Sequence, residues 1–178
     1  MRKEAILSET TKVITNFSTI CSNVNDAVFF ESVDGKWSVA DNLKHLLIST
    51  NISALAFWLP KFLIRWIGGK PNRTSKTYEE LVQKYKLKLQ QGAVASARFV
   101  PKPTKDFTKK ENLLHQWDKV TQHYVKSLTK NRTEEDLDNY LIKHPLLGKI
   151  TLRELCYFTI YHTQHHTNTI NNITASSK

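Results

Sequence analysis

The fold is decided by residues 148–170, GKITLRELCYFTIYHTQHHTNTI, a stretch that predicts one long helix. Thr151 and Glu154 form a Thr-x-x-Glu capping box, a pair that marks the start of a helix. Apolar residues then recur at helical spacing: Leu152, Leu155, Cys156, Phe158 and Ile160. The rest of the chain has to provide the partners against which this apolar face packs.

Two histidines in the second half of this helix share one face. Four residues turn a helix by about 400°, so His162 and His166 lie about 6 Å apart and can bind one metal ion. His165 lies about 100° around the helix from His166 and is expected to face away, although a pairing with His162 stays open. Taken alone, this pair is a weak signal, because histidine-rich helix ends are often simply solvated.

Three more long helical patterns precede this one. The first covers 3–24, the second runs from Ser38 to about Pro60, and the third runs from Thr108 to about Leu128. A shorter helix, capped by Thr77 with Glu80, lies in an irregular crossover at about 68–107. Four long helices with one long connection between the second and the third predict an all-α four-helix bundle, with residues 1–178 as a single domain. The residues expected to face inward are Ile6, Val13, Ile14, Phe17, Ile20 and Cys21 in the first helix, Val39, Leu43, Leu46, Leu47, Ile52 and Leu55 in the second, and Leu113, Leu114, Trp117, Val120 and Tyr124 in the third.

Composition agrees with a helical protein. The chain has only 5 Gly and 5 Pro in 178 residues, which are few turn-forming residues for a many-stranded β fold. Cys21 and Cys156 both lie in apolar-periodic segments, which favours buried reduced thiols over a disulfide framework. The opening residues MRKEAILSETTK lack the apolar core of a signal peptide, so a cytoplasmic location is expected.

The segment 57–67 is strongly apolar but is interrupted by Lys61 and Arg65. It is too short to span a membrane, so no membrane partner is expected. We interpret it as a buried helical extension or part of a pocket wall. Trp58, Phe62 and Trp66 are expected in the core, and if they were exposed they could instead form the face of a homodimer.

The formal net charge is +10, and many of the lysines and arginines lie between Arg65 and Lys130. Such an excess could attract a nucleic-acid backbone or anionic small molecules. The sequence has no recognition-helix motif, basic arm or aromatic stacking signature, so no nucleic-acid partner is expected. A solvated basic face is the first interpretation, and steering of an anionic substrate is the second.

A further histidine, His45, lies in the second helix one turn after Asp41, whose carboxylate could accept a hydrogen bond from the imidazole and orient it. His162 also shares its face with polar Thr159 and Thr169, a stripe that a plain apolar core would not contain. Two bundle helices therefore carry histidine where facing side chains could converge.

These residues resemble the DinB/YfiT-like superfamily of metalloenzymes. The resemblance rests on Lys36-Trp37-Ser38 followed by His45, on the later His-x-x-x-His, and on HPLLGK at 144–149, which is similar to a lead-in found in a DinB-like subgroup. It implies a four-helix bundle in which His45, His162 and His166 bind a divalent metal, with zinc or nickel as the expected ion. Where the family often has Glu or Gln, this chain has Asp41, whose shorter side chain keeps the orienting role with less reach.

Three histidine ligands without a fourth protein ligand are typical of an open, catalytic metal site. The family includes thiol S-transferases that use low-molecular-weight thiols and proteins described as hydrolases, so the resemblance implies a small-molecule substrate and either reaction. No catalytic base is evident, with His144 and His123 as candidates that are also explained as loop and surface residues. The alternative is a non-catalytic bundle, as a monomer or a dimer, that binds metal or an acidic partner.

Overall fold

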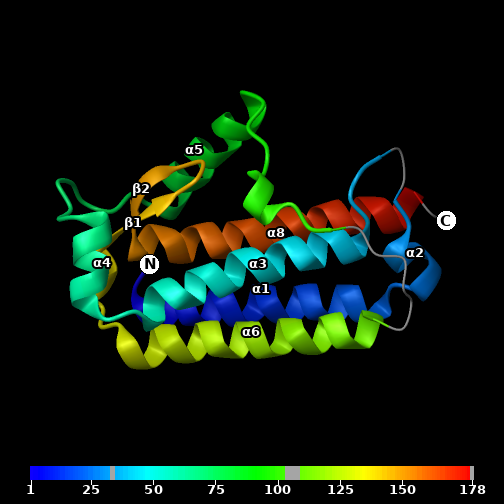
Figure 1. Cartoon of the computed structure of the whole chain (residues 1–178), viewed down its shortest axis with the longest axis horizontal. Coiled ribbons are helices and arrows are strands. Elements are labelled where there is room, and N and C mark those ends of the chain that lie inside the picture. Colours follow the sequence, from blue (N-terminus) through cyan, green and yellow to red (C-terminus); the bar gives the residue numbers. More distant parts are fainter. Residues whose placement is uncertain (33–34, 103–108, 177–178) are drawn as a thin grey trace.

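A computed structural model describes residues 1–32, 35–102 and 109–176 of the chain. Its helices and strands are α1 (Lys3–Asn23), α2 (Asp26–Phe30), α3 (Val39–Trp58), α4 (Lys61–Gly68), α5 (Tyr78–Gln90), the 3-10 helix η1 (Ala97–Phe99), α6 (Lys110–Asn131), α7 (Asp136–Asn139), β1 (Leu141–His144), β2 (Gly148–Thr151) and α8 (Leu152–Ser176). Figure 1 shows α1, α3, α6 and α8 running alongside one another as the body of the molecule.

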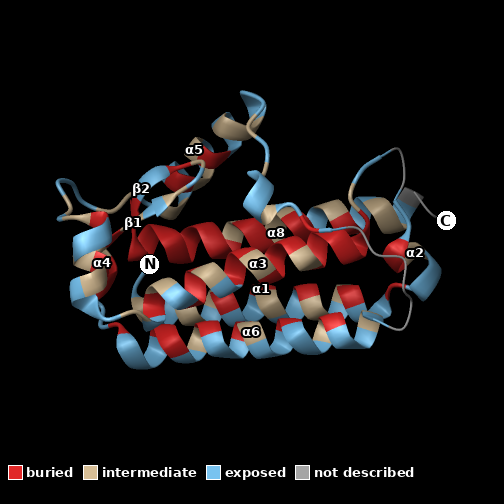
Figure 2. Ribbon diagram, viewed as in Figure 1, coloured by how far each residue is buried: buried red, intermediate tan, exposed pale blue. Residues whose placement is uncertain are grey.

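These four long helices form the predicted all-α bundle. Each packs against two others: α1 against α6 and α8, and α3 against α6 and α8. Buried residues therefore follow the inward faces of the ribbons in Figure 2. Ile6, Val13, Phe17 and Cys21 are buried on α1 as predicted, because one apolar stripe of the helix faces α6 and α8.

Capping boxes begin the helices at the predicted places. In both α3 and α5 the cap and the third helical residue exchange hydrogen bonds, through Ser38 with Asp41 and through Thr77 with Glu80. In α8 the amide of Glu154 donates to Thr151 Oγ1, and the amide of Thr151 donates to a Glu154 carboxylate oxygen. The predicted cap of the third long helix, Thr108, lies outside the described residues. Residues 103–107 of the predicted crossover also lie outside them. The described part of the crossover contains α5 and η1.

The helix predicted over 148–170 begins at Leu152, so its first four residues were wrongly assigned to the helix. Gly148–Thr151 is instead a strand paired antiparallel with Leu141–His144, with His144 opposite Gly148. The three intervening residues make the turn, and Gly148 has φ +74°, the left-handed conformation that such hairpin loops need. His144 Nδ1 accepts hydrogen bonds from the amides of Leu146 and Leu147 at 3.2 Å. The HPLLG sequence is therefore a hairpin turn.

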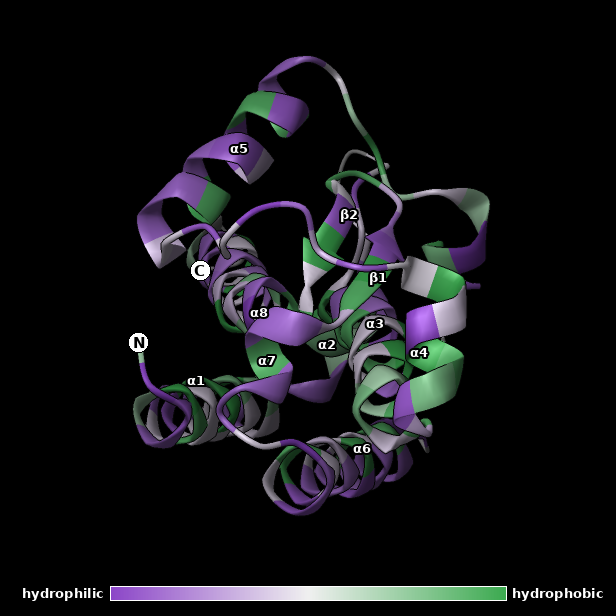
Figure 3. Cartoon of the chain, turned by 90° about the vertical axis from the view of Figure 1, so that its left-hand side faces the viewer, coloured by the Kyte–Doolittle hydropathy of each residue, from purple (hydrophilic) through white to green (hydrophobic). Residues whose placement is uncertain are grey.

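The second wrong prediction concerns the aromatic residues after α3. The chain bends by 114° between α3 and α4, and Trp58, Phe62 and Trp66 lie on the outside of this bend. Phe62 is 70% and Trp66 83% exposed, so the expectation that they belong to the core is not met. Figure 3 shows how much of the α4 ribbon is hydrophobic, in contrast to the largely hydrophilic α5. The homodimer that such a face would allow stays a prediction.

No single helix in the described ranges is both long enough and apolar enough to cross a membrane; α3 and α4 reach that composition only as a bent pair. The other face of α4 packs against β1. Gly68 lies so close to β1 that a Cβ there would be 1.8 Å from the carbonyl oxygen of Leu141. This contact brings α4 and the hairpin together at one end of α3 (Figure 1).

Candidate metal centre

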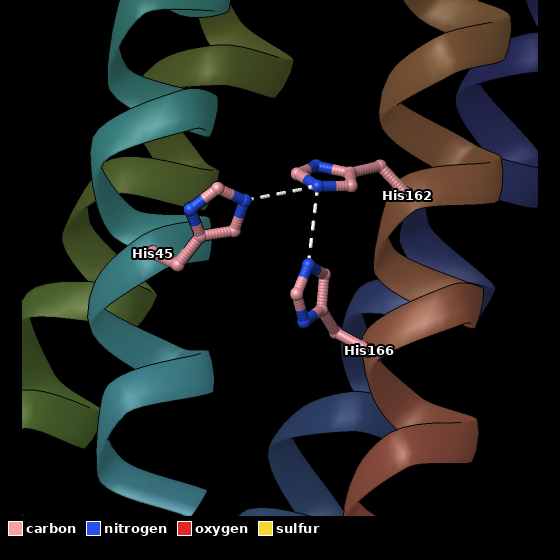
Figure 4. Close-up of side chains that lie close together, drawn as sticks. All are labelled: His45, His162 and His166. Atoms are coloured by element: carbon pink, nitrogen blue, oxygen red, sulfur yellow. Dashed lines mark hydrogen bonds between the residues drawn. The ribbon is translucent and has the colours of Figure 1, made fainter. Parts of the chain in front are cut away.

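Three histidines from two helices converge in the interior, as the sequence predicts. His45 comes from α3, and His162 and His166 come from α8 (Figure 4). The Nε2 atom of His162 lies 3.1 Å from that of His45 and 3.1 Å from that of His166. The three side chains can each offer one nitrogen within 4.8 Å of the other two, and all three residues are buried.

The helical framework sets this arrangement. His162 and His166 are one turn apart on the face of α8 that packs against α3. Aromatic rings cover the imidazoles: Phe158 stacks on His162 with centroids 4.7 Å apart, and Trp37 lies 5.0 Å from His45 and 6.4 Å from His166. The site is therefore closed off from bulk water by apolar surface on two sides.

The outer ring nitrogens all have hydrogen-bond partners. His45 Nδ1 lies 2.8 Å from the carbonyl oxygen of Phe99, and His166 Nδ1 lies 2.6 Å from Asn42 Oδ1. Both partners are acceptors, so each Nδ1 carries a proton and each Nε2 presents a lone pair. The Asn42 amide nitrogen donates in turn to the carbonyl of Ser38 at 2.8 Å, which fixes the direction of its side-chain oxygen.

His162 follows the same pattern. Its Nδ1 lies 3.3 Å from Ser49 Oγ, and that hydroxyl donates to the carbonyl of Leu46, which leaves its oxygen to accept from the imidazole. With all three rings in this tautomer, the Nε2 lone pairs of His45, His162 and His166 face one another, and a cation between them would be stabilised by all three. Nitrogen ligands about 2.0–2.1 Å from a tetrahedral zinc ion lie roughly 3.3 Å apart, close to the 3.1 Å separations here. The donor set fits a divalent metal.

Burial also keeps the imidazoles neutral. It lowers the pKa of His45, and it lowers the pKa values of His162 and His166 well below the usual value, with the neighbouring imidazoles adding to the effect in these two. Only the neutral imidazole has a lone pair for a metal. At neutral pH the three side chains are therefore in the form that binds metal.

The orienting role predicted for Asp41 is wrong. One Asp41 oxygen accepts hydrogen bonds from the amide and hydroxyl of Ser38, and the other has no hydrogen-bond partner in the described part of the chain. The His45 ring nitrogens instead contact Phe99 and His162. Asp41 caps α3, and its side chain is directed at the helix start, one turn away from the imidazole.

The remaining histidines lie in different places. His165 is half-buried beside the site, with its ring centroid 5.2 Å from that of His166, but it is not one of the three converging residues. His123 is exposed on α6, away from the site, which removes it as a candidate base. His144 lies against Phe158 with centroids 4.2 Å apart, and its Nδ1 lone pair is occupied by two backbone amides. The proton of its neutral ring is therefore on Nε2, so His144 can donate a hydrogen bond and cannot serve as a base.

A cavity of about 1140 Å³ opens onto the three histidines. Its walls come from α3, α8, α4, α5, the hairpin and the segment around η1, and His144 and His165 both line it. Tyr85 of α5 also lines it, and burial raises the pKa of this phenol to about 12, so it stays protonated. All three converging histidines line the cavity, so a ligand in it would lie beside the histidine cluster.

Comparison with known proteins identifies the family to which this chain belongs. A sequence profile described as the DinB superfamily matches residues 9–170, which is nearly the whole chain. The chain belongs to the DinB superfamily. No curated protein and no solved structure gave a significant match. The membership covers all three converging histidines, so in this DinB protein the histidine cluster lies inside the family domain.

Three groups at the centre of this DinB site were missed from the sequence: Asn42, Ser49 and the carbonyl of Phe99. Asn42 and Ser49 could have been found, because they lie three residues before and four residues after His45 and so share its helix face. The Phe99 carbonyl gives no such signal. It is a backbone group that reaches His45 from a segment 54 residues away.

Proposed function

We propose that this DinB protein is a metal-dependent enzyme acting on a small molecule, as a hydrolase or as a thiol S-transferase. The observation that carries the proposal is the convergence of three Nε2 lone pairs on one point beside a large cavity. His45, His162 and His166 would hold a divalent cation, with zinc or nickel favoured by imidazole ligands. A fourth position facing the cavity would be free for water, a thiol or substrate.

When bound, such an ion supplies Lewis acidity, which lowers the pKa of water or of a thiol to near neutrality. The chain itself supplies orientation. Asn42, Ser49 and the Phe99 carbonyl hold the three imidazoles in one tautomer, and Trp37 and Phe158 limit the access of bulk water. His144 and Tyr85 offer protonated groups that can donate hydrogen bonds to a substrate oxygen.

The first test is metal analysis of the purified protein. We expect one divalent ion per chain in the wild type and none in His162→Ala, with a lower melting temperature on metal removal. His123→Ala is the matched control, because it removes an exposed imidazole from α6 and should retain the ion. Absence of metal from the wild type, with melting unchanged in His45→Ala and His162→Ala, would refute the proposed site.

The second test separates the two reactions. Metal-loaded protein is assayed with ester, thioester and amide substrates in water, and then with electrophiles and a low-molecular-weight thiol. Turnover without thiol indicates the hydrolase, and turnover that requires thiol indicates the transferase. Bound metal with no turnover in either series favours the alternative, a metal-binding bundle without catalysis.

A further inference from the structure

The cavity is elongated along α3. His45, Ser49, Ser53 and Ala56 all line it and follow one face of the helix at spacings of four, four and three residues, and Leu59, directly after the helix, lines it too. With a rise of 1.5 Å per residue, the path from His45 to Ala56 is about 16 Å, and Leu59 extends it by about one more turn. The cavity is therefore much longer than a single functional group bound at the histidines.

Most residues along this long arm are apolar, and the polar ones are Ser53 of α3 with Lys143 and His144 of β1. On the α3 side of the arm, the small side chains of Ser53 and Ala56 leave room for a ligand along the helix. Opposite them stand Leu155 and Phe158 of α8, and the end of the arm is formed by Ile64 of α4 with Leu141 of β1. Those last two elements pack against each other, so the bend after α3 and the hairpin together close this end. Figure 1 shows α4 and the hairpin meeting at the same end of α3.

Polar and charged residues line the opposite end of the cavity. Beyond the histidines the lining includes Glu31, Lys36 and Thr169, side chains that carry charge or a hydroxyl group. The three histidines thus stand between a polar region and an apolar arm. A small polar substrate would leave the arm filled with water against apolar walls, which is unfavourable. An amphiphile would match both regions at once.

We infer that the ligand of this cavity is an amphiphile with a single long acyl or alkyl chain. The chain lies in the arm between α3 and α8, and the polar group lies at the histidines. This inference rests on the proposed function for the reacting end, whereas chain binding depends on the apolar walls alone. The cavity of about 1140 Å³ lies just above the range of about 300–1,000 Å³ for small-molecule sites, so it has room for a long chain.

The inference is tested with straight-chain carboxylic acids of increasing length, added to metal-free protein. Affinity is measured by displacement of a fluorescent fatty acid, below the concentrations at which the acids form micelles. Each methylene buried in the arm should tighten binding about fourfold. Affinity should stop rising once the chain reaches α4. Affinity independent of chain length would overturn the inference, and so would a rise without a plateau, because surface adsorption has no end wall.

A plug in the arm gives the second test. Ser53 lies eight residues after His45, about 12 Å along the helix, and Ser53→Phe should block the arm beyond that point. We expect hexanoic acid to bind as it does to wild type and palmitic acid to bind at least tenfold more weakly. Asn51→Phe adds the same ring at an exposed position of α3 and should change neither affinity. Unchanged palmitic acid binding in Ser53→Phe would refute the assignment.

A second arm variant and a metal measurement distinguish failure of the chain-binding arm from failure of the proposed metal centre. If Ser53→Phe does not fold, Ile52→Trp narrows the same arm from a half-buried position and carries the same expectation. Metal content is measured on the same preparations. Wild-type protein that binds long chains but no metal would support the arm and refute the proposed catalytic centre. Protein that binds metal but shows no preference for chain length would support the proposed metal centre and refute the acyl-chain arm.

Discussion

The hydrogen bond from His166 to Asn42 gives the sharpest test of the metal centre. Asn42 is 1% exposed, and its Oδ1 lies 2.6 Å from His166 Nδ1. Asn42→Leu keeps the approximate size of the side chain and removes the acceptor. The His166 ring then loses the partner that holds its proton on Nδ1. The proton can move to Nε2, which then has no lone pair to offer to a metal.

The expected magnitude follows from the role of such partners. Loss of a group that orients a metal-binding histidine costs about 10–100-fold in metal affinity, which corresponds to about 1.4–2.7 kcal/mol. Asn42→Asp keeps an acceptor at the same place and makes it anionic, so it should bind the metal at least as tightly as wild type. The affinities are measured by competition with a chromophoric chelator, at one pH and with zinc as the probe.

The control is Asn51→Leu, which makes the same substitution at an exposed position of the same helix. Thermal unfolding of the metal-free variants separates stability from metal binding, because loss of the hydrogen bonds of Asn42 costs about 1–3 kcal/mol in its own right. Equal metal affinity in wild type and Asn42→Leu would refute the orienting role. An Asn42→Asp variant that binds more weakly than Asn42→Leu would refute the tautomer assignment.

Three further outcomes are expected. Glu154→Gln should lower the free energy of unfolding by about 2–3 kcal/mol in denaturant titration. The reason is that Arg73 donates two hydrogen bonds, at 2.6 and 2.8 Å, to this fully buried carboxylate. A loss below about 1 kcal/mol would contradict this. Burial lowers the pKa of His144 to about 4, so the unfolded chain takes up a proton between about pH 6.5 and 4 that the folded protein does not, and stability should fall by about 3 kcal/mol as the pH decreases through that window. His144→Asn should lose this component of the pH dependence, and an unchanged profile would count against it. Burial raises the pKa of both Cys21 and Cys156 to about 12, so neither thiol should react with a thiol reagent until denaturant unfolds the protein, and rapid labelling of folded protein would show that a thiol is accessible.

The bundle could be predicted because its signals are local. A capping box needs two residues three positions apart, and Thr151 with Glu154 marks the true start of α8. Apolar spacing likewise identified the buried face of α1, including Phe17. The histidine pair on α8 follows from the helix period, whereas the third member, His45, was placed by resemblance to the family and not by spacing.

The missed features depend on long-range contacts. The hairpin at 141–151 consists of four-residue strands, too short for an alternating pattern to stand out. The aromatic face of α4 was predicted as core because the sequence does not show that the chain bends by 114° and turns Trp66 outward. Leu55, predicted to face inward, is 45% exposed because it lies on the wall of the cavity. An apolar residue facing a cavity and one in a packed core have the same sequence signature.

The segment between α5 and α6 illustrates how the site and the fold depend on each other. Connections of this length usually have a functional role, and here the carbonyl of Phe99 lies 2.8 Å from His45 Nδ1. Lys44, next to His45, also donates to the same segment, at the carbonyl of Lys102. Because the Phe99 carbonyl fixes the tautomer of a residue in the proposed metal site, metal binding and the contact between Phe99 and His45 must stabilise each other by the same free energy. The segment also lines the cavity, through Phe99 and Val100. A ligand that displaces it would weaken the His45 orientation, so the position of a substrate in the cavity and the strength of the metal centre are coupled through one backbone carbonyl.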